Sequence, residues 1–494
     1  MAVKSMTRNE EREESINDRN NRRENKARRR RNREFTLVAY FFLILFLALV
    51  GYITYFQVVK AEDVINNAYN KRQKLMAEKV IRGDIKTSNG KVIATTRVKG
   101  DKEVRYYPEG KKYAHAVGYS TNGTTGIEEF CNFELLRTHS FIGTQLVNTL
   151  SGNKSMGDTV VTTIDSKLQD VCYSSLSGYE GAIICIDPST GKILSMISKP
   201  DYDPNMIKDN YESIIGNGDD NNSVLLNRTT QGAYTPGSTF KIFTTLEYLK
   251  ENGADKDIDF TCTGSLTRNG SSIHCYGGET HGHINLEKAF AESCNCAYAD
   301  IGLSLNINSF RELTKKLLFN KELPTDYPSV KSNFSLTRES STDSIMQGSI
   351  GQDKITVSPM HMALVASAIA NKGVLMNPYV VDRIENDTGM IVKENEESEY
   401  GRLISREEAR VMRKLMKGTT SYGTAGALNS DNYKAYGKTG SAEVSDSSDD
   451  THSWFVGFAT KGKKKIAIAV IVEKQGNGSK YAVPIAKKVF DAYF

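Results

Sequence analysis

Residues 35–59 form an uncharged run, FTLVAYFFLILFLALVGYITYFQVV, in a chain of 494 residues. A helix rises about 1.5 Å per residue, so a run of this length crosses the hydrocarbon core of a bilayer, which is about 30 Å thick. In that core the backbone must satisfy its own hydrogen bonds, which restricts a single span to a helix. The sequence therefore predicts one N-terminal transmembrane helix. A buried core helix is the alternative, but few core helices stay uncharged over this length.

The net charge of the chain is concentrated before this run. Residues 1–34 carry 12 Lys and Arg against 7 Asp and Glu, a net charge of +5 that equals the 64 − 59 of the whole chain. The remaining residues therefore sum to zero, which argues against a nucleic-acid-binding protein. Basic residues beside a span favour the cytoplasmic side. We expect a disordered cytoplasmic tail over 1–34, an uncleaved anchor over 35–59, and the rest of the chain outside the cytoplasm.

The residues after the span divide into two predicted parts. Residues 60–155 are interpreted as a small, non-catalytic, membrane-proximal module with a polar helical stalk over 60–80. The dipeptide Asn89-Gly90 between two short strand patterns is typical of a type I′ hairpin. The tripeptide Arg82-Gly83-Asp84 at the start of this hairpin is interpreted as structural rather than as an adhesion motif.

Residues 156–494 are predicted to form one α+β domain. The strings GAIICIDPSTGKILSMIS and SWFVGFATKGKKKIAIAVIVE each indicate two apolar strands joined by a turn, and they lie near opposite ends of this part. Helical patterns lie between them, and YAVPIAKKVFDAYF closes the chain as an amphipathic helix. The order predicts a sheet that joins hairpins distant in sequence.

A serine and a lysine in the string STFK, Ser238 and Lys241, are the first candidates for chemistry. A Pro-Gly turn precedes them and an apolar, helix-periodic segment follows, which places both on one face at the start of a helix. The helix N-terminus directs N–H groups towards the serine, and a neutral lysine can remove its proton. A second match to this spacing, Ser151 and Lys154, has no helix after it and is interpreted as a coincidence in a loop.

Two further strings complete the candidate site. Ser293 and Asn295, in SCN after a predicted helix, are expected to relay a proton and to align a substrate backbone; the alternative is that Asn295 caps the next helix. Lys438, Thr439, Gly440 and Ser441 are predicted to form a strand edge, and a solvated turn is the alternative. Such an edge can bind an extended peptide, with Thr439 and Lys438 on its carboxylate. The N–H groups of Ser441 and Ser238 would form an oxyanion hole, and Lys438 would be the second cation that lowers the pKa of Lys241.

Seven cysteines lie after the span, an odd number that excludes complete pairing into disulfides. Two cysteines, a histidine and a third cysteine fall within about 35 residues, a set of ligands that suits tetrahedral Zn²⁺ in a structural role. The candidate ligands are Cys262, Cys275, His281 and Cys294. A disulfide between Cys262 and Cys275, or free thiols as small core residues, are the alternatives.

The order, spacing and flanks of these strings resemble the class B penicillin-binding proteins, the monofunctional D,D-transpeptidases of bacterial cell-wall synthesis. RGDIKTSNGKVIA, YTPGSTFKIFT, HGHINLEKAFAESCN, GQDKITVSPMHMALVASAIANKGV and YGKTGSAEV with HSWFVGFA carry the resemblance, over roughly residues 80–494. It implies the serine-transpeptidase fold, an antiparallel sheet with helices on both sides. It implies that Ser238 forms the acyl-enzyme, Lys241 is its base, Ser293 and Asn295 assist, and Lys438, Thr439 and Gly440 bind the donor.

The resemblance also implies D-Ala-D-Ala transpeptidation of peptidoglycan stem peptides without a catalytic cofactor, acylation by β-lactams, and a polytopic glycosyltransferase partner in the bacterial cell membrane. The module over 60–155 is too short for a glycosyltransferase domain of its own. A D,D-carboxypeptidase or β-lactamase of the same fold and a non-catalytic division scaffold are the alternatives. A β-lactam sensor would need a cytoplasmic signalling domain larger than 34 residues, and a Ser-His-Asp hydrolase would need a G-x-S-x-G elbow.

Overall fold

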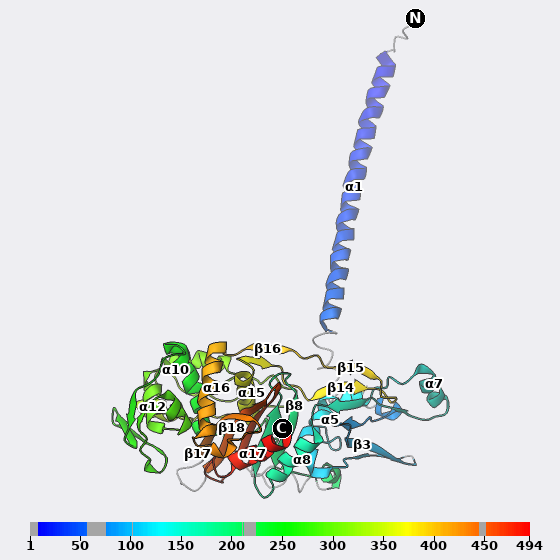
Figure 1. Ribbon diagram of the computed structural model, residues 1–494. Coiled ribbons are helices and arrows are strands. Elements are labelled where there is room, and N and C mark those ends of the chain that lie inside the picture. Colours follow the sequence, from blue (N-terminus) through cyan, green and yellow to red (C-terminus); the bar gives the residue numbers. More distant parts are fainter. Residues whose placement is uncertain (1–7, 57–75, 101, 210, 212–223, 444–450) are drawn as a thin grey trace. The chain divides into compact units, whose positions relative to one another are not determined.

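The computed structural model of the chain (Figure 1) describes residues 8–56, 76–100, 102–209, 211, 224–443 and 451–494. It contains two units, residues 1–70 and residues 71–494. The stalk expected over 60–80 lies largely outside the described residues.

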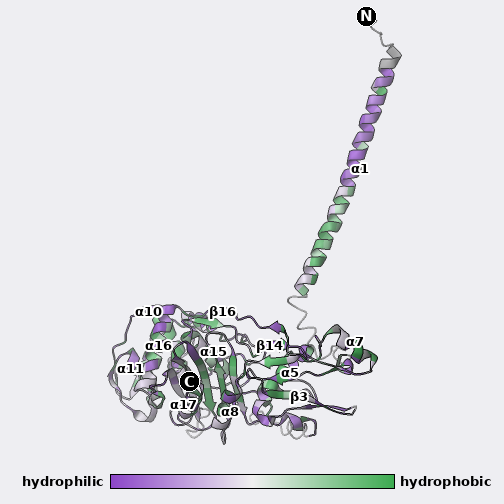
Figure 2. Cartoon of the chain, turned by 45° about the vertical axis from the view of Figure 1, so that its right-hand side comes forward, coloured by the Kyte–Doolittle hydropathy of each residue, from purple (hydrophilic) through white to green (hydrophobic). Residues whose placement is uncertain are grey.

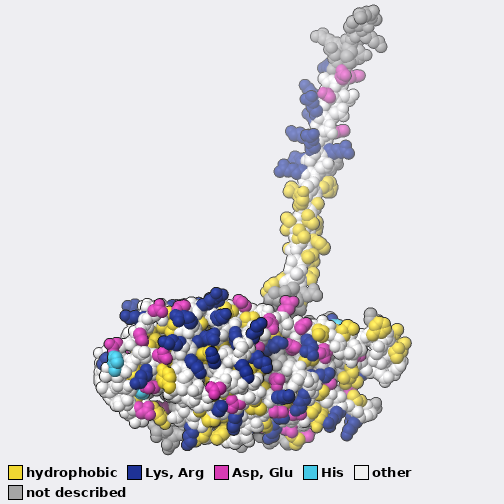
Figure 3. Space-filling model, in the orientation of Figure 1, with side chains coloured by type: hydrophobic (Ala, Val, Ile, Leu, Met, Phe, Trp, Pro, Cys, Tyr) yellow, Lys and Arg dark blue, Asp and Glu magenta, His cyan; other side chains and the backbone are white. Residues whose placement is uncertain are grey.

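The first unit contains one helix of 48 residues, α1 (Arg8–Tyr55). Its first half is hydrophilic and bears the Lys and Arg side chains, whereas its second half is hydrophobic (Figures 2 and 3). By length and composition it can cross a membrane. The expected disorder of the tail is wrong from Arg8 onwards. Ion pairs at i,i+4 spacing join Asp18 to Arg22 (3.5 Å) and Arg30 to Glu34 (3.7 Å), and continuity with the apolar helix avoids the cost of a new helix nucleus.

The second unit is built around a five-stranded antiparallel sheet of strand order β17-β18-β19-β7-β8. The two apolar strings predicted from the sequence form its hairpins, and β19 pairs with β7 from Ala467 opposite Ile186 to Val472 opposite Gly181. The sheet therefore joins hairpins distant in sequence, as predicted. The strands are β7 (Gly181–Ile186), β8 (Ile193–Lys199), β17 (Lys434–Glu443), β18 (Thr451–Lys461) and β19 (Lys464–Val472).

Helices cover both faces of this sheet, so its strands are buried on both sides. Along β7, Ile184 belongs to one buried cluster, whereas its neighbour Ile183 belongs to another. The α+β fold with an antiparallel sheet between helices is therefore confirmed. On one face lie α10 (Lys241–Asn252), α15 (Pro359–Ala370) and α16 (Arg406–Ser421); on the other lie α8 (Ser166–Ser175), capped by Asp165 as its pattern predicts, and α17 (Ala482–Tyr493).

A second sheet of six strands has the order β15-β14-β6-β2-β3-β4. Its strands come from two distant parts of the chain, since β14 pairs with β6 and β2 pairs with β6 on the other side. The expected division between residues 155 and 156 falls inside β5 (Ser155–Met156), which pairs with β1 (Val80–Ile81). The six strands are β2 (Ile85–Lys86), β3 (Val92–Lys99), β4 (Lys102–Tyr106), β6 (Thr159–Thr162), β14 (Val381–Glu385) and β15 (Ile391–Glu394).

The turn between β2 and β3 differs from the predicted type I′ geometry. Gly90 has a left-handed φ of +82°, but Asn89 does not have a positive φ, which a type I′ turn requires. The Gly90 N–H donates to the carbonyl of Thr87 at 2.9 Å. The register also shifts between Ile85 and Lys86, so the extra residue is absorbed as a bulge.

The remaining elements are short. Near the second sheet lie α4 (Ala114–Val117), α5 (Ile127–Phe130), α6 (Asn132–Leu135) and α7 (Ile142–Leu150). Around the candidate site lie β9 (Phe260–Cys262), β10 (Ser265–Arg268), β11 (Ser271–His274), β12 (Gly282–Ile284), α11 (Leu286–Ala291), α12 (Asn295–Ser304), α13 (Ile307–Lys316) and α14 (Thr342–Ser349). The strands β13 (Val374–Met376) and β16 (Glu399–Arg402) pair with each other.

A buried carboxylate, Glu128, ties the second sheet to α5. It accepts from Arg82 at 2.6 Å and from Arg105 at 2.7 Å, and its own side chain is fully buried. Burial alone raises the pKa of Glu128, but the two guanidinium charges together outweigh it, so the pKa lies below its ordinary value. Arg82 is thus engaged inside the protein, which supports the structural interpretation of its tripeptide.

We expect Glu128→Gln to lower the free energy of unfolding by about 3–5 kcal/mol, because it leaves two buried guanidinium groups without their counter-charge. Urea unfolding of the detergent-solubilised chain measures the change, with the exposed neighbour Glu129→Gln as the control. Since the folded pKa is depressed, the difference between wild type and Glu128→Gln is largest at neutral pH and shrinks as the pH falls through the folded pKa. Equal stability of the two variants at neutral pH would contradict the proposed role of the ion pairs.

Candidate active site

Ser238 lies on a short 3₁₀ turn, Gly237–Phe240, that leads directly into α10. Gly237 has a left-handed φ of +52°, and a Cβ there would lie 2.6 Å from the carbonyl oxygen of Ser441 on β17. The Gly237 N–H donates to Gly351 at 2.9 Å. A residue without a side chain therefore lets the serine turn dock against the edge of the sheet. Ser238 itself is partly exposed.

Lys241 begins α10 one turn after Ser238, and its side chain is completely buried. Its ammonium nitrogen lies 2.6 Å from the carbonyl oxygen and 3.1 Å from the hydroxyl of Ser293, and 2.8 Å from Oδ1 of Asn295. The first two strings predicted from the sequence are thus joined by one side chain. Within the part of the chain that the structure describes, no hydrogen bond joins Lys241 to the Ser238 hydroxyl.

The loop between α11 and α12 holds Ser293 in a conformation that is uncommon for a residue with a side chain, with a φ of +61°. The alternative in which Asn295 caps α12 is wrong, because Cys294 is the cap and its sulfur accepts from the N–H of Ala297. The Asn295 amide is instead held between Lys241 and the carbonyl of His274, to which it donates at 3.0 Å.

The third string lies on β17, which is an edge strand of the five-stranded sheet. A Cβ on Gly440 would lie 2.9 Å from the carbonyl oxygen of Pro236, so this glycine permits the close approach predicted for it. The approaching backbone is that of Pro236, which directly precedes the turn Gly237–Phe240 that carries Ser238 (the serine turn). Thr439 shares a hydrogen bond of 2.6 Å with the hydroxyl of Thr424. The alternative of a solvated turn is therefore wrong.

A cleft of about 670 Å³ joins the three strings. Six of the predicted catalytic and substrate-binding residues line it: Ser238, Ser293, Asn295, Thr439, Gly440 and Ser441. Lys241 and Lys438 do not, because both are completely buried beneath it. Lys438 donates to the Thr439 carbonyl at 3.3 Å, so a direct contact with a substrate carboxylate requires it to move. The catalytic roles of these residues stay predictions.

The two buried lysines have depressed pKa values. Burial lowers the pKa of Lys241 to about 8, although the nearby sulfur of Cys294 acts in the opposite direction. Burial and the charge of Lys241 lower the pKa of Lys438 well below its ordinary value. From the sequence we expect the charge of Lys438 to lower the pKa of Lys241. In the structure the charge of Lys241 lowers the pKa of Lys438 instead, and burial is the main cause of the lowered pKa of Lys241. A neutral Lys241 has a lone pair and two N–H groups, so the Ser293 hydroxyl can then donate to it.

The comparisons with known proteins follow the same three strings. The model of the penicillin binding protein transpeptidase domain matches residues 181–491, and that of the penicillin binding protein A dimerisation domain matches residues 82–160. The chain belongs to the penicillin-binding proteins. The transpeptidase and dimerisation matches, together with relatives of the D,D-transpeptidase group, support class B.

Relatives of this penicillin-binding protein resemble it over most of their length. The peptidoglycan D,D-transpeptidase PbpA of Mycolicibacterium smegmatis is 29% identical over 93% of this chain and 99% of its own. The structure of penicillin-binding protein A from M. tuberculosis as a ceftriaxone acyl-enzyme complex is 26% identical, with a TM-score of 0.76 over 84% of this chain and 99% of the other. A D,D-transpeptidase domain from Eggerthella lenta is 27% identical, with a TM-score of 0.75 over 84% and 98%.

Sequence reasoning missed the part of the cleft wall that lies beside β17 in this penicillin-binding protein. Thr424, Asn477 and Ser479 line it, and the Ser479 hydroxyl donates to the carbonyl of Thr424 at 2.5 Å. Thr424 lies after α16 and Ser479 after β19, in loops without a recognisable string. Their place in the cleft follows only from their position beside β17, and that position cannot be predicted without the register of the sheet.

We expect the rate of acylation by a fluorescent penicillin to rise with pH through a pKa of about 8, because only neutral Lys241 accepts a proton. From pH 7 to pH 9 the neutral fraction rises from about 0.09 to about 0.91, which predicts a rise of roughly tenfold. The rate is measured by labelling the solubilised protein at each pH and quenching samples at fixed times. Lys241→Arg keeps a charge at every pH and should label at least a hundredfold more slowly. A rate that is flat between pH 7 and 9 would contradict Lys241 as the titrating base.

We expect Gly440→Ala to slow acylation about tenfold or more, because its Cβ would press on the Pro236 carbonyl and displace the serine turn. Gly426→Ala is the matched control, since nothing lies within 4 Å of a Cβ at that position. Labelling rates are compared after circular dichroism has shown that both variants are folded. Wild-type labelling of Gly440→Ala would show that the close approach does not position Ser238.

Proposed function

We propose that this chain is a serine D,D-transpeptidase that cross-links peptidoglycan stem peptides and is acylated by β-lactams. The observation that carries the proposal is the single cleft in which Ser238 lies between the edge strand β17 and the loop held by Lys241. Family membership and relatives named as peptidoglycan D,D-transpeptidases support it.

In the proposed reaction, a D-Ala-D-Ala peptide adds to the free edge of β17 by main-chain hydrogen bonds. Neutral Lys241, with Ser293 as relay, takes the proton of the Ser238 hydroxyl, whose oxygen attacks the penultimate carbonyl. The N–H groups of Ser238 and Ser441 stabilise the oxyanion. The tetrahedral intermediate collapses with the release of D-alanine, which leaves with the proton, and the acyl-enzyme remains.

In the second half of the reaction an amine of a neighbouring strand attacks the ester carbonyl. The amine loses a proton to the Lys241–Ser293 pair, Ser238 regains one, and a new peptide bond replaces the ester. Asn295 holds the substrate backbone, and Lys438 lies below the cleft beside Lys241. A β-lactam follows the first half of the reaction and opens its ring without a leaving group, so the adduct stays on Ser238.

We also propose the membrane topology and a partner. The 12 Lys and Arg of residues 1–34 favour a cytoplasmic N-terminus and a catalytic domain outside the cytoplasm. The helix α1 is the anchor in this arrangement. Glycan strands for cross-linking must come from a glycosyltransferase, and a polytopic membrane enzyme in the same bilayer would supply them.

We expect Ser238→Ala to abolish labelling by a fluorescent penicillin, because it removes the hydroxyl that is the proposed nucleophile in the cleft. The chain offers a matched control in Ser151→Ala, which removes the serine of the second S-x-x-K spacing and should label like wild type. Gel fluorescence and the intact mass of the adduct measure the outcome. Persistent labelling of Ser238→Ala, or loss of labelling in Ser151→Ala alone, would show that Ser238 is not the nucleophile.

Two further readouts separate the alternatives. A stable antibiotic adduct, seen in the mass of the intact protein, favours a transpeptidase. Rapid release of hydrolysed antibiotic favours a β-lactamase. Release of D-alanine from a stem peptide without cross-linking favours a carboxypeptidase. A strain depleted of the protein should be rescued by Ser151→Ala and not by Ser238→Ala. Rescue by Ser238→Ala would indicate a non-catalytic scaffold.

A further inference from the structure

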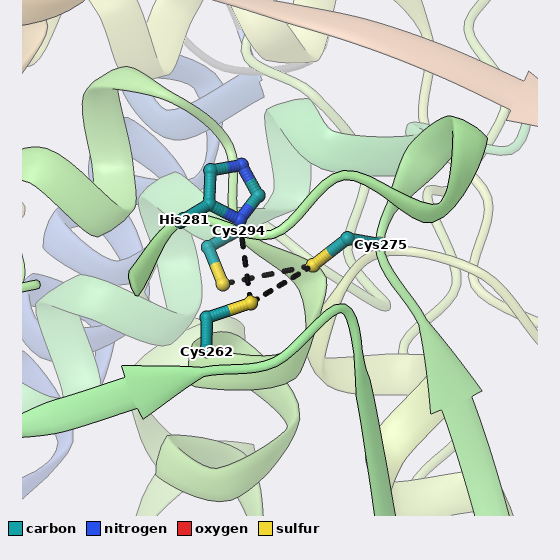
Figure 4. Close-up of side chains that lie close together, drawn as sticks. All are labelled: Cys262, Cys275, His281 and Cys294. Atoms are coloured by element: carbon teal, nitrogen blue, oxygen red, sulfur yellow. Dashed lines mark hydrogen bonds between the residues drawn. The ribbon is translucent and has the colours of Figure 1, made fainter. Parts of the chain in front are cut away.

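Four side chains that could hold a metal ion meet beside the candidate active site, at the base of a small β-rich segment (Figure 4). Cys262 ends β9, Cys275 follows β11, His281 precedes β12, and Cys294 caps α12. The segments are brought together by two separate pairings, β12 with β9 and β10 with β11. Thus four positions spread over 33 residues (262–294) point towards one centre.

The distances between these side chains match the edges of a tetrahedral zinc site. Zn–S bonds of about 2.3 Å and Zn–N bonds of about 2.0 Å place sulfurs about 3.8 Å apart and a nitrogen about 3.5 Å from a sulfur. The sulfur of Cys275 lies 3.6 Å from that of Cys262 and 3.7 Å from that of Cys294. Nδ1 of His281 lies 3.4 Å from the sulfur of Cys262. All four candidate ligand atoms lie within 4.8 Å of one another.

The surroundings suit thiolate ligands better than the two alternatives. A disulfide needs sulfurs about 2.05 Å apart, so the distance of 3.6 Å between Cys262 and Cys275 excludes one in this structure. Backbone N–H groups point at two of the sulfurs, from Gly264 to Cys262 at 3.5 Å and from Ala297 to Cys294 at 3.4 Å. Such donors are typical of the second shell of a metal–thiolate site.

The histidine is also placed as a ligand rather than as a surface residue. Only 8% of the His281 side chain is exposed, and among the described residues its Nε2 makes no hydrogen bond but lies 3.9 Å from a carboxylate oxygen of Glu279. By contrast, 74% of the nearby His283 side chain is exposed, and it faces Asp259 at 3.4 Å. The two histidines therefore serve as candidate and control within one short segment.

We propose that this protein binds one structural Zn²⁺ through the sulfurs of Cys262, Cys275 and Cys294 and Nδ1 of His281. Four protein ligands fill a tetrahedral site and leave no open position, so the ion has no part in the chemistry of acylation. The fifth sulfur nearby, that of Cys296, lies 3.5 Å from Cys275 but outside the group of four. It faces the carbonyl of Ile273 at 3.9 Å and is not a ligand.

The ion has a structural consequence at the active-site loop. Cys294 lies between Ser293 and Asn295, the two residues that contact Lys241. A bond from Cys294 to the ion fixes this loop to β9 and to the end of β11. The proposal does not depend on the proposed reaction, because the metal is measured without peptide or antibiotic.

The first test is the metal content of the full-length, detergent-solubilised protein, purified without chelator and with no added metal. Inductively coupled plasma mass spectrometry should give about one zinc per chain. Protein denatured with chelator should have the mass of seven free thiols. Refolding or exchange with Co²⁺ should give the d–d absorption of a tetrahedral ion and a thiolate-to-metal charge-transfer band. A wild-type protein that takes up neither zinc nor cobalt, or whose mass is two hydrogens lighter, overturns the proposal.

Matched variants then test the ligand set. Cys262→Ser and His281→Ala should lose zinc to near zero, whereas Cys296→Ser and His283→Ala should keep about one ion per chain. Loss of zinc in Cys296→Ser with retention in Cys294→Ser would overturn the assignment. If a ligand variant fails to fold, alkylation of the wild type remains decisive. Only the thiols of Cys262, Cys275 and Cys294 should become newly reactive towards the alkylating reagent after chelation. Mass spectrometry of the modified peptides identifies the thiols that react.

Discussion

The buried amine of Lys241 is the interaction on which the rest of the site depends. It comes from the start of α10, directly after the turn that carries Ser238, and its oxygen partners are Ser293, in the loop between α11 and α12, and Asn295, the first residue of α12. A buried nitrogen without such partners would cost several kcal/mol, so the helix and the loop must be placed together. The same burial lowers the pKa of Lys241 and so prepares an amine that accepts a proton near neutral pH. Stability and chemistry thus impose the same geometry.

Much of the fold followed from local patterns. The apolar hairpins of the five-stranded sheet, the cap at Asp165 and the C-terminal helix are set by periodicity and turn residues that act within about 20 residues. The site residues were found because short strings combine a helix start, a loop and a strand edge. Their meeting in one cleft follows from the resemblance and the sheet together, since spacing along the chain alone does not bring them together.

The remaining features depend on contacts between distant residues. The pairing of β14 with β6 and the wall formed by Thr424 have no local signal. At Asn295, local sequence offered a cap, but the contacts with Lys241 and His274 hold the amide instead and Cys294 takes the capping position. The helix over residues 8–34 arises from continuity with the apolar segment, which composition alone does not reveal. The position of Lys438 beneath the cleft likewise depends on the packed sheet.

The sharing of β6 between two parts of the chain has a consequence for dissection of this protein. A cut between residues 155 and 156 would separate β2 from β6 and leave each fragment with a bare row of backbone donors and acceptors. Such exposed edges recruit other strands, so the halves would tend to aggregate instead of behaving as independent modules. The parts of the chain before and after this position therefore form one continuous hydrogen-bonded unit at β2 and β6, and a pulling force on one part is transmitted to the other through these hydrogen bonds.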